Sequence, residues 1–552
     1  MRDFLPSDVR KRNYVIGIIK EVYESYGFEP LETPAVENIE TLMGKYGDEG
    51  NQLIFKILKR GEKLEESLKS GVLSPESGVP AQDSRLKTQD SLSDLALRYD
   101  LTVPLARVVA NNKNELPKFF KRYQIQPVWR ADRPARGRFR EFCQCDVDVI
   151  GSDSMVVEAE LISAVSEILI RLGFSKFEVR INNRRLLESI LNAAAVPEKK
   201  RIDALIALDK LDKIGRAGVQ KEFLERGLGE RAASLLLEEL EYYISKIGSL
   251  SDITNDSSSL DPVSLLARLE TAEKERDDHI EGISKFIRAQ KGSLDIPRPR
   301  GTWWDLLTKD PDQLELTKLN AEQKTLPSDE IEKLKVSLLQ LANENVFLKL
   351  QLFIQSRTHG IEGLAELSQV LEFCQDSSAQ SHIRVDPSLA RGLSYYTGTI
   401  MEINVPDLAG SLGGGGRYDG LIGMFGKEQI PACGFSLGLE RILVVMDERN
   451  MFPPEIAASN SADVMVTIWN EETIAESLKL ANELRANGLR VTVYPEADKL
   501  GKQMKYADAI KVPWVCVLGD SEIAENKVTL KNMASGEQMT VIRDEAASKI
   551  KK

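Results

Sequence analysis

The sequence predicts a mixed α/β protein built from two to four domains. Its 552 residues exceed what one hydrophobic core normally holds, since domains usually contain about 100–200 residues. Two strands around a polar loop are expected within 122–150, and residues 464–531 alternate strand and helix. Leucine- and glutamate-rich helical stretches dominate residues 185–375 instead. These observations predict a sheet-containing first part, a mostly helical insertion and a small α/β domain at the end.

The first elements follow from apolar spacing and stop signals. Residues 7–26 are predicted to be a helix, because apolar residues recur at i, i+3 and i+4 and Gly27 follows. The segment Gly27–Pro34 contains two prolines and is expected to be extended. Residues 59–93 are polar and lack periodicity, which predicts a mobile loop or an inserted hairpin. A helix is expected over about 154–172.

Strand character returns late in the chain. Residues 395–405 are predicted to form a strand, a glycine run follows, and a helix is expected from about Ser436. Residues 451–463 carry two adjacent prolines and small side chains, which suits a linker. The predicted domain segments are 1–184, 185–375, 376–450, a linker at 451–461, and 462–552.

Charge and composition restrict the function classes. The net charge of −12 argues against a protein that coats nucleic acid nonspecifically. Locally, however, residues 118–140 contain eight basic residues and one acid, which favours an anionic partner. No apolar run approaches the roughly 20 residues that span a bilayer, and residues 1–12 do not form a signal peptide. The five scattered cysteines indicate reduced thiols, so we expect a cytoplasmic protein with no membrane partner.

One predicted strand carries a polar face. Arg140, Phe142, Gln144, Asp146 and Asp148 share that face by alternation, while cysteines and valines take the other. Such a face offers acceptors for ammonium or ring N–H groups beside arginine donors for phosphate. A solvated sheet face is an equally supported alternative at this point. The two cysteines are more consistent with a buried strand face than with a metal site.

Three later clusters also suit a ligand pocket. Arg391–Gly398 places an arginine and two tyrosines beside a predicted strand, although a plain hairpin is the alternative. In Gly413–Gly420 a glycine run ends in Arg-Tyr-Asp-Gly, which favours close approach of backbone to a ligand. Gly434–Arg441 is expected to open a helix whose N-terminus favours an anion near Arg441. Because no GxxxxGK[ST] loop is present, any bound ATP must be held by arginines.

These segments resemble the class II aminoacyl-tRNA synthetases. Their motifs 1, 2 and 3 are similar to Gly27–Pro34, Arg130–Asp148 and Gly434–Arg441. Arg391–Gly398 resembles the signature peptide of histidyl-tRNA synthetases, and Arg98–Pro104 resembles their amino-acid-binding loop. The resemblance covers about residues 1–180 and 381–552. It implies an antiparallel class II catalytic sheet flanked by helices, a homodimer joined at motif 1, and an anticodon-binding C-terminal domain.

The resemblance also implies a reaction and its residues. Histidine would be activated by ATP with Mg²⁺, and the histidyl group would pass to tRNA(His). Arg130 and Arg391 would act at the α-phosphate and in the transition state. The implied ATP-binding residues are Arg130, Arg138, Glu141 and Arg441, with Glu141 as a possible Mg²⁺ ligand. The implied histidine-binding residues are Asp100, Thr102, Gln144, Asp148, Tyr395, Tyr396 and Tyr418. Arg133 and Arg136 would meet the tRNA acceptor end.

Some features leave alternatives open. Ser394 stands where the family's signature peptide usually carries Asp, which puts the orientation of Arg391 in question. Residues 499–503 resemble a recurring family stretch expected near the anticodon. The alternative function is a catalytically silent paralogue: a regulatory subunit, as in ATP phosphoribosyltransferase, or a module that senses tRNA. The resemblance assigns no role to residues 185–375.

Overall fold

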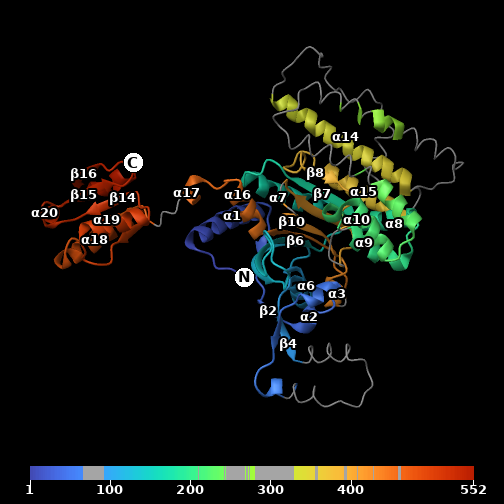
Figure 1. The fold of residues 1–552 in the computed structure, drawn as a ribbon, viewed down its shortest axis with the longest axis horizontal. Coiled ribbons are helices and arrows are strands. Elements are labelled where there is room, and N and C mark those ends of the chain that lie inside the picture. Colours follow the sequence, from blue (N-terminus) through green and yellow to red (C-terminus); the bar gives the residue numbers. More distant parts are fainter. Residues whose placement is uncertain are drawn as a thin grey trace, which may run out of the picture. The chain divides into compact units, whose positions relative to one another are not determined.

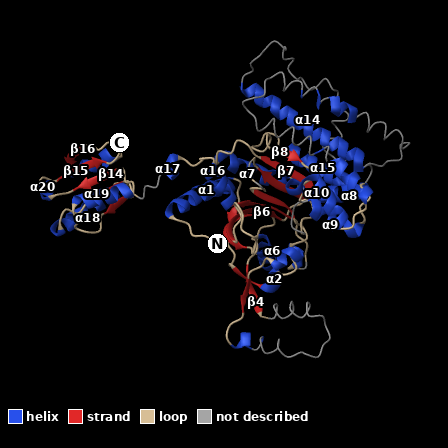
Figure 2. Cartoon of the chain, in the orientation of Figure 1, coloured by secondary structure: helices blue, strands red, loops and turns tan. Residues whose placement is uncertain are grey.

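The computed structural model divides the chain into two compact units. One comprises Met1–Asp3 and Arg12–Met451, and the other comprises Phe4–Lys11 and Phe452–Lys552. Figure 2 shows the mixture of helices and strands that the sequence predicted. The described residues are 1–65, 67, 92–208, 210–240, 243, 268, 271–272, 274–279, 328–354, 358–390, 395–406, 408, 410–426, 428–457 and 462–551.

An eight-stranded sheet forms the centre of the first unit, in the order β1-β5-β6-β11-β10-β9-β7-β8. Neighbours from β5 to β7 pair antiparallel, while the edge strands β1 and β8 pair parallel. The predicted antiparallel sheet is therefore confirmed. Its strands are β1 Glu29–Pro30, β5 Phe120–Trp129, β6 Glu141–Ile150, β7 Glu178–Asn183, β8 Ile383–Val385, β9 Thr399–Asn404, β10 Gly413–Arg417 and β11 Ala432–Gly438.

Helices cover this sheet, as Figure 1 shows. The N-terminal helix α1 buries Val15 and Tyr23, and the Tyr23 hydroxyl donates to the Cys145 carbonyl of β6 at 3.3 Å. The helix α15 packs against α7, α8 and β7. The bounds of the longer helices in this part of the chain are α1 Pro6–Ser25, α6 Thr102–Asn112, α7 Val156–Arg171, α8 Arg184–Ala193, α9 Arg201–Leu208, α10 Leu211–Glu225, α14 Ser328–Ile354, α15 Thr358–Phe373 and α16 Leu439–Glu448.

Most predicted elements of this unit are confirmed, with one clear error. The helix predicted over 7–26 and the strand pair within 122–150 are present as α1, β5 and β6. The helix predicted from Ser436 is wrong there, because β11 continues to Gly438 and α16 begins at Leu439. The apolar run containing Ser436 is buried between β6 and β10, and sheet pairing outweighs its helical spacing. Arg441 still lies in the first turn of a helix.

Cys143 and Cys145 lie together on one face of β6, and that face is buried, as the alternation predicted. Cys143 and Cys145 are buried and unbonded, and the other three cysteines are likewise buried free thiols. The polar face of β6 is also buried, so the alternative of a solvated sheet face is wrong. Within the described part of the chain, no helix is long and apolar enough to cross a membrane.

A smaller sheet precedes the pocket-forming helix α6. It has the order β2-β4-β3, with β2 Val36–Asn38, β3 Lys56–Leu58 and β4 Ser93–Leu97. The antiparallel strands β3 and β4 flank the segment predicted as a loop or an inserted hairpin. Most of that segment, including 68–91, lies outside the described residues, so the prediction is not decided. Short helices α2 Ile39–Leu42 and α3 Gly47–Gln52 complete this region.

The second unit contains a five-stranded sheet in the order β13-β12-β14-β15-β16. The alternating strands and helices predicted within 464–531 are confirmed. The strand β16 was not predicted; it is a short edge strand whose residues are mostly exposed. The main elements are β12 Val464–Val466, α18 Ile474–Ala486, β13 Val491–Val493, α19 Leu500–Ala509, β14 Trp514–Val517, β15 Lys527–Asn532 and β16 Gln538–Ile542; shorter helices are α17 Pro454–Ala457, α20 Asp520–Ala524 and α21 Ala546–Ile550.

The glycines of β10 permit the close packing of the central sheet. A Cβ atom on Gly415 would lie 2.2 Å from the Gly434 carbonyl oxygen and 2.7 Å from Cα of Phe435. Backbone atoms of a central strand cannot move away cheaply. We therefore predict that Gly415→Ala lowers the free energy of unfolding by about 1–3 kcal/mol or more.

The matched control is Gly17→Ala, in the middle of α1, where a new Cβ would meet no heavy atom within 4 Å. This change should stabilise the protein by about 0.5–1 kcal/mol, because alanine has the higher helix propensity. Chemical denaturation of both variants measures the difference. Equal stability of the two would show that β10 tolerates a side chain at Gly415.

Candidate functional site

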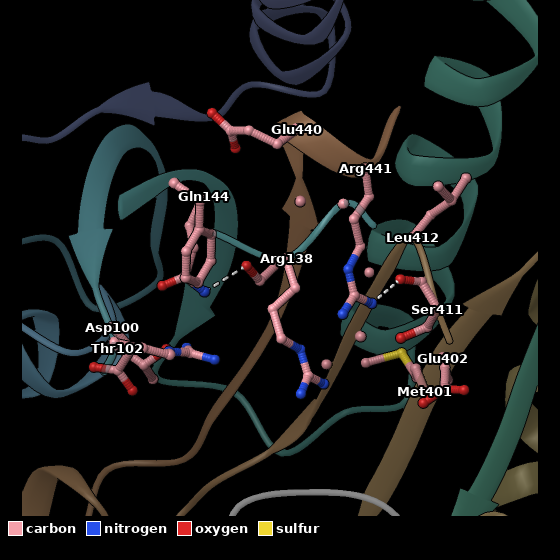
Figure 3. Close-up of a pocket in the computed structure, with 18 of the residues that line it drawn as sticks. Asp100, Thr102, Arg138, Gln144, Met401, Glu402, Ser411, Leu412, Glu440 and Arg441 are labelled. Atoms are coloured by element: carbon pink, nitrogen blue, oxygen red, sulfur yellow. Dashed lines mark hydrogen bonds between the residues drawn. The ribbon is translucent and has the colours of Figure 1, made fainter. Parts of the chain in front are cut away.

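A pocket of about 320 Å³ opens on the polar face of the central sheet. Its walls come from the start of α6, the loop between β5 and β6, the strands β6, β9, β10 and β11, and the first turn of α16. Figure 3 shows the side chains around it. Eight of the predicted site residues line the pocket: Asp100, Thr102, Arg130, Arg138, Gln144, Tyr395, Tyr396 and Arg441.

Arg130 is held at one wall of the pocket by two cation–π contacts and a hydrogen bond. Its guanidinium carbon lies 4.4 Å from the ring centroid of Tyr99 and 5.2 Å from that of Phe142. Its Nε donates to the Tyr99 carbonyl oxygen at 3.0 Å. A guanidinium held between aromatic rings loses little further freedom when it binds an anion.

Arg138 and Arg441 supply two further cations. Figure 3 shows their guanidinium groups extending in the same direction into the pocket. Arg441 donates to the Ser411 carbonyl oxygen. Its aliphatic part lies against Gly137, where an added Cβ would be 3.2 Å from Cγ of Arg441. Gly137 has φ +68°, so it satisfies both the turn and the close approach. Two adjacent arginines favour a polyanionic ligand such as a phosphate chain.

Asp100 provides negative charge at another wall. It accepts hydrogen bonds from the Tyr46 hydroxyl at 2.9 Å, the Tyr395 hydroxyl at 3.5 Å and the Val103 backbone N–H at 3.1 Å. Burial raises the pKa of Asp100, and these hydrogen bonds together with Arg130 oppose that rise. The carboxylate is thus oriented by its neighbours and suits a cationic group of a ligand.

Gln144 and Asp146 continue the polar face of β6. The Gln144 amide Nε2 donates to the Ser436 hydroxyl at 2.8 Å. Among the described residues, Gln144 Oε1 and Asp146 Oδ1 are buried without a hydrogen-bond donor. Burial raises the pKa of Asp146 to about 7, while Arg122 opposes the rise and Asp148 adds to it. Of these two side chains only Gln144 lines the pocket, so its Oε1 is available to an N–H group of a ligand.

Asp148 and Tyr418 lie behind the pocket wall rather than on it. Asp148 is buried, forms an ion pair of 2.7 Å with Arg122, and accepts from the Tyr418 hydroxyl at 2.5 Å. Burial raises the pKa of Asp148, whereas Arg122 and Tyr418 lower it. The rings of Tyr395 and Tyr418 meet edge to face at 6.0 Å. Asp148 is therefore connected to the pocket-lining Tyr395 through one tyrosine.

The remaining predicted residues are placed differently. Glu141 is exposed at the start of β6 and does not line the pocket, whereas Glu402 of β9 is 5% exposed and does. Arg133 and Arg136 are exposed in the loop between β5 and β6, and Arg136 pairs with Glu448 of α16. Arg391 and Ser394 lie outside the described residues.

Sequence reasoning gave no role in the site to Asp132, Glu402 or Glu440, which line the pocket, nor to Arg122, which pairs with Asp148. Glu402 lies in the strand predicted over 395–405. The sequence of that strand does not show which of its two faces meets a ligand, so Glu402 could not be assigned to the pocket. Glu440, beside Arg441, is buried, lines the pocket and accepts from Cys143 N–H at 2.9 Å. Arg122 was counted only as part of a basic stretch. Its pairing with Asp148 depends on the β5–β6 register, which the sequence does not specify.

The pocket is bipolar. Its lining carries both signs of charge: the arginines Arg130, Arg138 and Arg441, the carboxylates of Asp100, Asp132, Glu402 and Glu440, and the amide of Gln144. It can hold a phosphate chain beside a small molecule that carries an ammonium group, with their reacting ends in between.

Comparison with known proteins identifies relatives over the full length. A family model described as "Histidyl-tRNA synthetase" matches residues 63–272 and 301–442, and an "Anticodon binding domain" model matches 463–552. The histidine–tRNA ligase of Porphyromonas gingivalis is 37% identical, covering 99% of this chain and 96% of its own. That of Christiangramia forsetii is 36% identical, covering 97% and 95%. The crystal structure of histidyl-tRNA synthetase from Nostoc sp. PCC 7120 has a TM-score of 0.64 at 26% identity, covering 100% and 97%.

The raised pKa of Asp146 predicts a pH-dependent stability. In the unfolded chain the pKa of this carboxyl is near its ordinary value of 3.8, whereas burial in the folded protein raises the pKa to about 7. The free energy of unfolding therefore falls as pH rises from about 4 through 7, because the buried group must ionise in the folded state. We predict that Asp146→Asn raises the thermal unfolding midpoint more at pH 8 than at pH 5, measured by calorimetry. The exposed Asp153→Asn should show no such difference; equal behaviour of both variants would contradict the assignment.

Proposed function

Because this chain belongs to the histidyl-tRNA synthetase family and is a histidine–tRNA ligase, we propose that its bipolar pocket activates histidine with ATP. A carboxylate oxygen of histidine attacks the α-phosphorus, and the bond to pyrophosphate breaks. The terminal ribose hydroxyl of tRNA(His) then attacks the histidyl carbonyl carbon, and AMP leaves. The observation that carries the proposal is the pairing of three arginines with Asp100 and Gln144 in one cavity.

The arginines are assigned to ATP. Arg130 contacts the α-phosphate, where negative charge develops on the phosphoryl oxygens during attack. Its fixed position between Tyr99 and Phe142 supports this role, since a preorganised cation needs no rearrangement during the reaction. Arg138 and Arg441 hold the γ-phosphate of a bent ATP. Arg391 is proposed to stabilise the transition state, on the resemblance alone.

The acidic part of the pocket is assigned to histidine. Asp100, Thr102 and Gln144 receive the α-ammonium group, which the oriented carboxylate of Asp100 and the free oxygen of Gln144 support. Tyr395 and Tyr396 flank the imidazole. Asp148 and Tyr418 recognise its N–H from behind this wall. A pocket that relies on buried hydrogen bonds rejects analogues lacking the partner by about 10⁴–10⁵.

Mg²⁺ is proposed as the ion that accompanies ATP. Magnesium usually binds one or two carboxylates together with substrate phosphates. Glu402 fits this need better than Glu141, because it lines the pocket and Glu141 does not. When bound, the ion would neutralise charge on the phosphates. Among the described residues, no group of three or more His, Cys, Asp or Glu side chains is arranged to hold a metal by itself.

The tRNA, the partner copy and the cellular compartment complete the proposal. Arg133 and Arg136 meet the acceptor end, and residues 462–552 bind the anticodon. Their match to an anticodon-binding model supports the second assignment.

We further propose a cytoplasmic homodimer joined through residues 27–34. The buried free cysteines suit a reducing compartment. Residues 185–375 are proposed as an insertion within the catalytic domain.

The alternative of a catalytically silent paralogue is not favoured. The ligases that match this chain do so over its full length, including the C-terminal domain. A regulatory subunit would have no need of arginines at the phosphate positions, and Arg130, Arg138 and Arg441 all line the pocket.

The first test is ATP–pyrophosphate exchange with each amino acid on the purified protein. Exchange with histidine alone is expected, and Arg130→Ala should lower its kcat by roughly 10²–10³, because it removes one preorganised cation. Arg171→Ala is the control, since Arg171 forms an exposed pair with Glu21 on the protein surface. Exchange that survives in Arg130→Ala would contradict the assignment of this arginine, and no exchange from the folded parent protein would contradict the proposed activation.

The acceptor-end assignment has a separate test. We predict that Arg133→Ala raises KM for tRNA and reduces the slope of log KM against log salt by about 1, since one phosphate contact is lost. Pyrophosphate exchange should not change, because it requires no tRNA. Arg171→Ala is the control, because its exposed pair with Glu21 lies outside residues 462–552. An unchanged salt dependence would refute the role of Arg133.

A further inference from the structure

The second unit has a point at which its strand connections diverge. The strands β12, β13 and β14 are parallel, with β12 between the other two. The chain leaves β12 through α18 to reach β13 on one side, then returns through α19 to β14 on the other. At the carboxyl ends of β12 and β14 the chain leaves in opposite directions, from β12 towards β13 and from β14 towards β15. In open α/β sheets, ligands bind in the crevice at such a switch point.

A half-exposed tryptophan occupies this point. Trp469 follows β12 by three residues, Gly519 follows β14 by two, and the Trp469 side chain is 48% exposed. The two ring-fusion carbons of the indole lie 3.7 and 3.9 Å from where a Cβ of Gly519 would be. The indole therefore rests close to the backbone of the neighbouring strand's end, while part of its surface faces solvent.

The residues on either side of Trp469 are held rigidly. Gln503 of α19 is buried at 1% exposure; its Nε2 donates to the Ile468 carbonyl at 2.6 Å, and its Oε1 accepts from Ile468 N–H at 3.0 Å. On the other side, Asn470 and Thr473 form a reciprocal capping box at 2.9 and 3.1 Å. The indole is thus positioned before any ligand arrives, which lowers the ordering cost of binding. Gln503, predicted near the anticodon, acts here as a positioning residue.

Charges around Trp469 are distributed unevenly. On the α19 side, Lys499 at the N-cap and Lys502 in the first turn are exposed, and Lys502 pairs with Asp498 at 2.9 Å. On the other side, Glu471 and Glu472 follow in sequence, and Glu522 accepts from Gly519 N–H at 3.2 Å. Lys499 and the N-terminus of α19 therefore favour a nucleic-acid backbone on the α19 side, with a base directed over the indole.

We propose that Trp469 is a stacking platform for one unpaired base of the tRNA anticodon loop. The inference rests on the proposed anticodon-binding role of residues 462–552 and names the residue that contacts the RNA. Unpaired RNA bases stack on aromatic side chains, and each such contact changes affinity by roughly 5- to 150-fold. Stacking alone does not select a base, so Trp469 contributes affinity and leaves base identity to other groups.

The test uses full-length protein and three variants: Trp469→Ala, Trp469→Phe and Met539→Ala. Met539 is a 38% exposed apolar residue on the edge strand β16, at the opposite end of the same sheet, and serves as the control. Aminoacylation is measured with full tRNA(His) and with an acceptor minihelix that lacks the anticodon loop. Trp469→Ala should raise KM for full tRNA about 5- to 150-fold, and Trp469→Phe should recover part of the loss. Minihelix charging and histidine-dependent pyrophosphate exchange should not change.

The outcomes separate this inference from the function on which it rests. An unchanged KM for full tRNA in Trp469→Ala, with exchange intact, would overturn the stacking role alone. An equal loss with minihelix and full tRNA would also overturn it, because the effect would then be structural. Absence of histidine-dependent exchange in the unmodified protein would instead contradict the proposed activation.

Discussion

The buried ion pair between Arg122 and Asp148 is the constraint on which the catalytic unit depends. Both side chains are nearly inaccessible, at 0% and 3% exposure, and they face each other across β5 and β6. Removing either partner would leave an uncompensated charge in the core, which typically costs about 3–5 kcal/mol. Asp148 also accepts from Tyr418, which follows β10, and Gly434 of β11 leaves it room: a Cβ there would lie 1.8 Å from Oδ1. One carboxylate thus joins elements that are far apart in sequence.

This ion pair also determines the electrostatics of the pocket. Arg122 opposes the rise in pKa that burial imposes on Asp146 and Asp148, so one buried cation serves two neighbouring acids. These two acids lie behind the pocket, whose own lining carries both carboxylates and arginines. A zwitterionic amino acid and a phosphate chain can therefore each find an opposite charge in it.

Local patterns predicted much of this from sequence, and long-range pairing accounts for what they missed. Alternation along β6 correctly separated the cysteines from Gln144 and the aspartates, and the glycine–arginine segments were expected around a pocket. Alternation could not show that both faces of β6 are covered, because burial depends on helices that pack from elsewhere. Glu402 replaced Glu141 as the pocket carboxylate for the same reason: adjacent strands, rather than adjacent residues, decide which side chains meet. The β11 error at Ser436 arose because an apolar run in a central strand resembles a buried helix.

Glycine and arginine depend on each other in this site. A guanidinium group needs space and fixed neighbours, and the backbone of Gly137 and Gly410 lies against Arg441 without a side chain between them. Likewise the glycines of β10 bring the sheet backbone to the pocket surface, where larger residues would fill the cavity. These glycines cost conformational entropy on folding, and the close packing of the sheet offsets that cost. Substitutions that improve local β propensity in β10 should therefore harm both folding and ligand access, because the same missing side chains serve both.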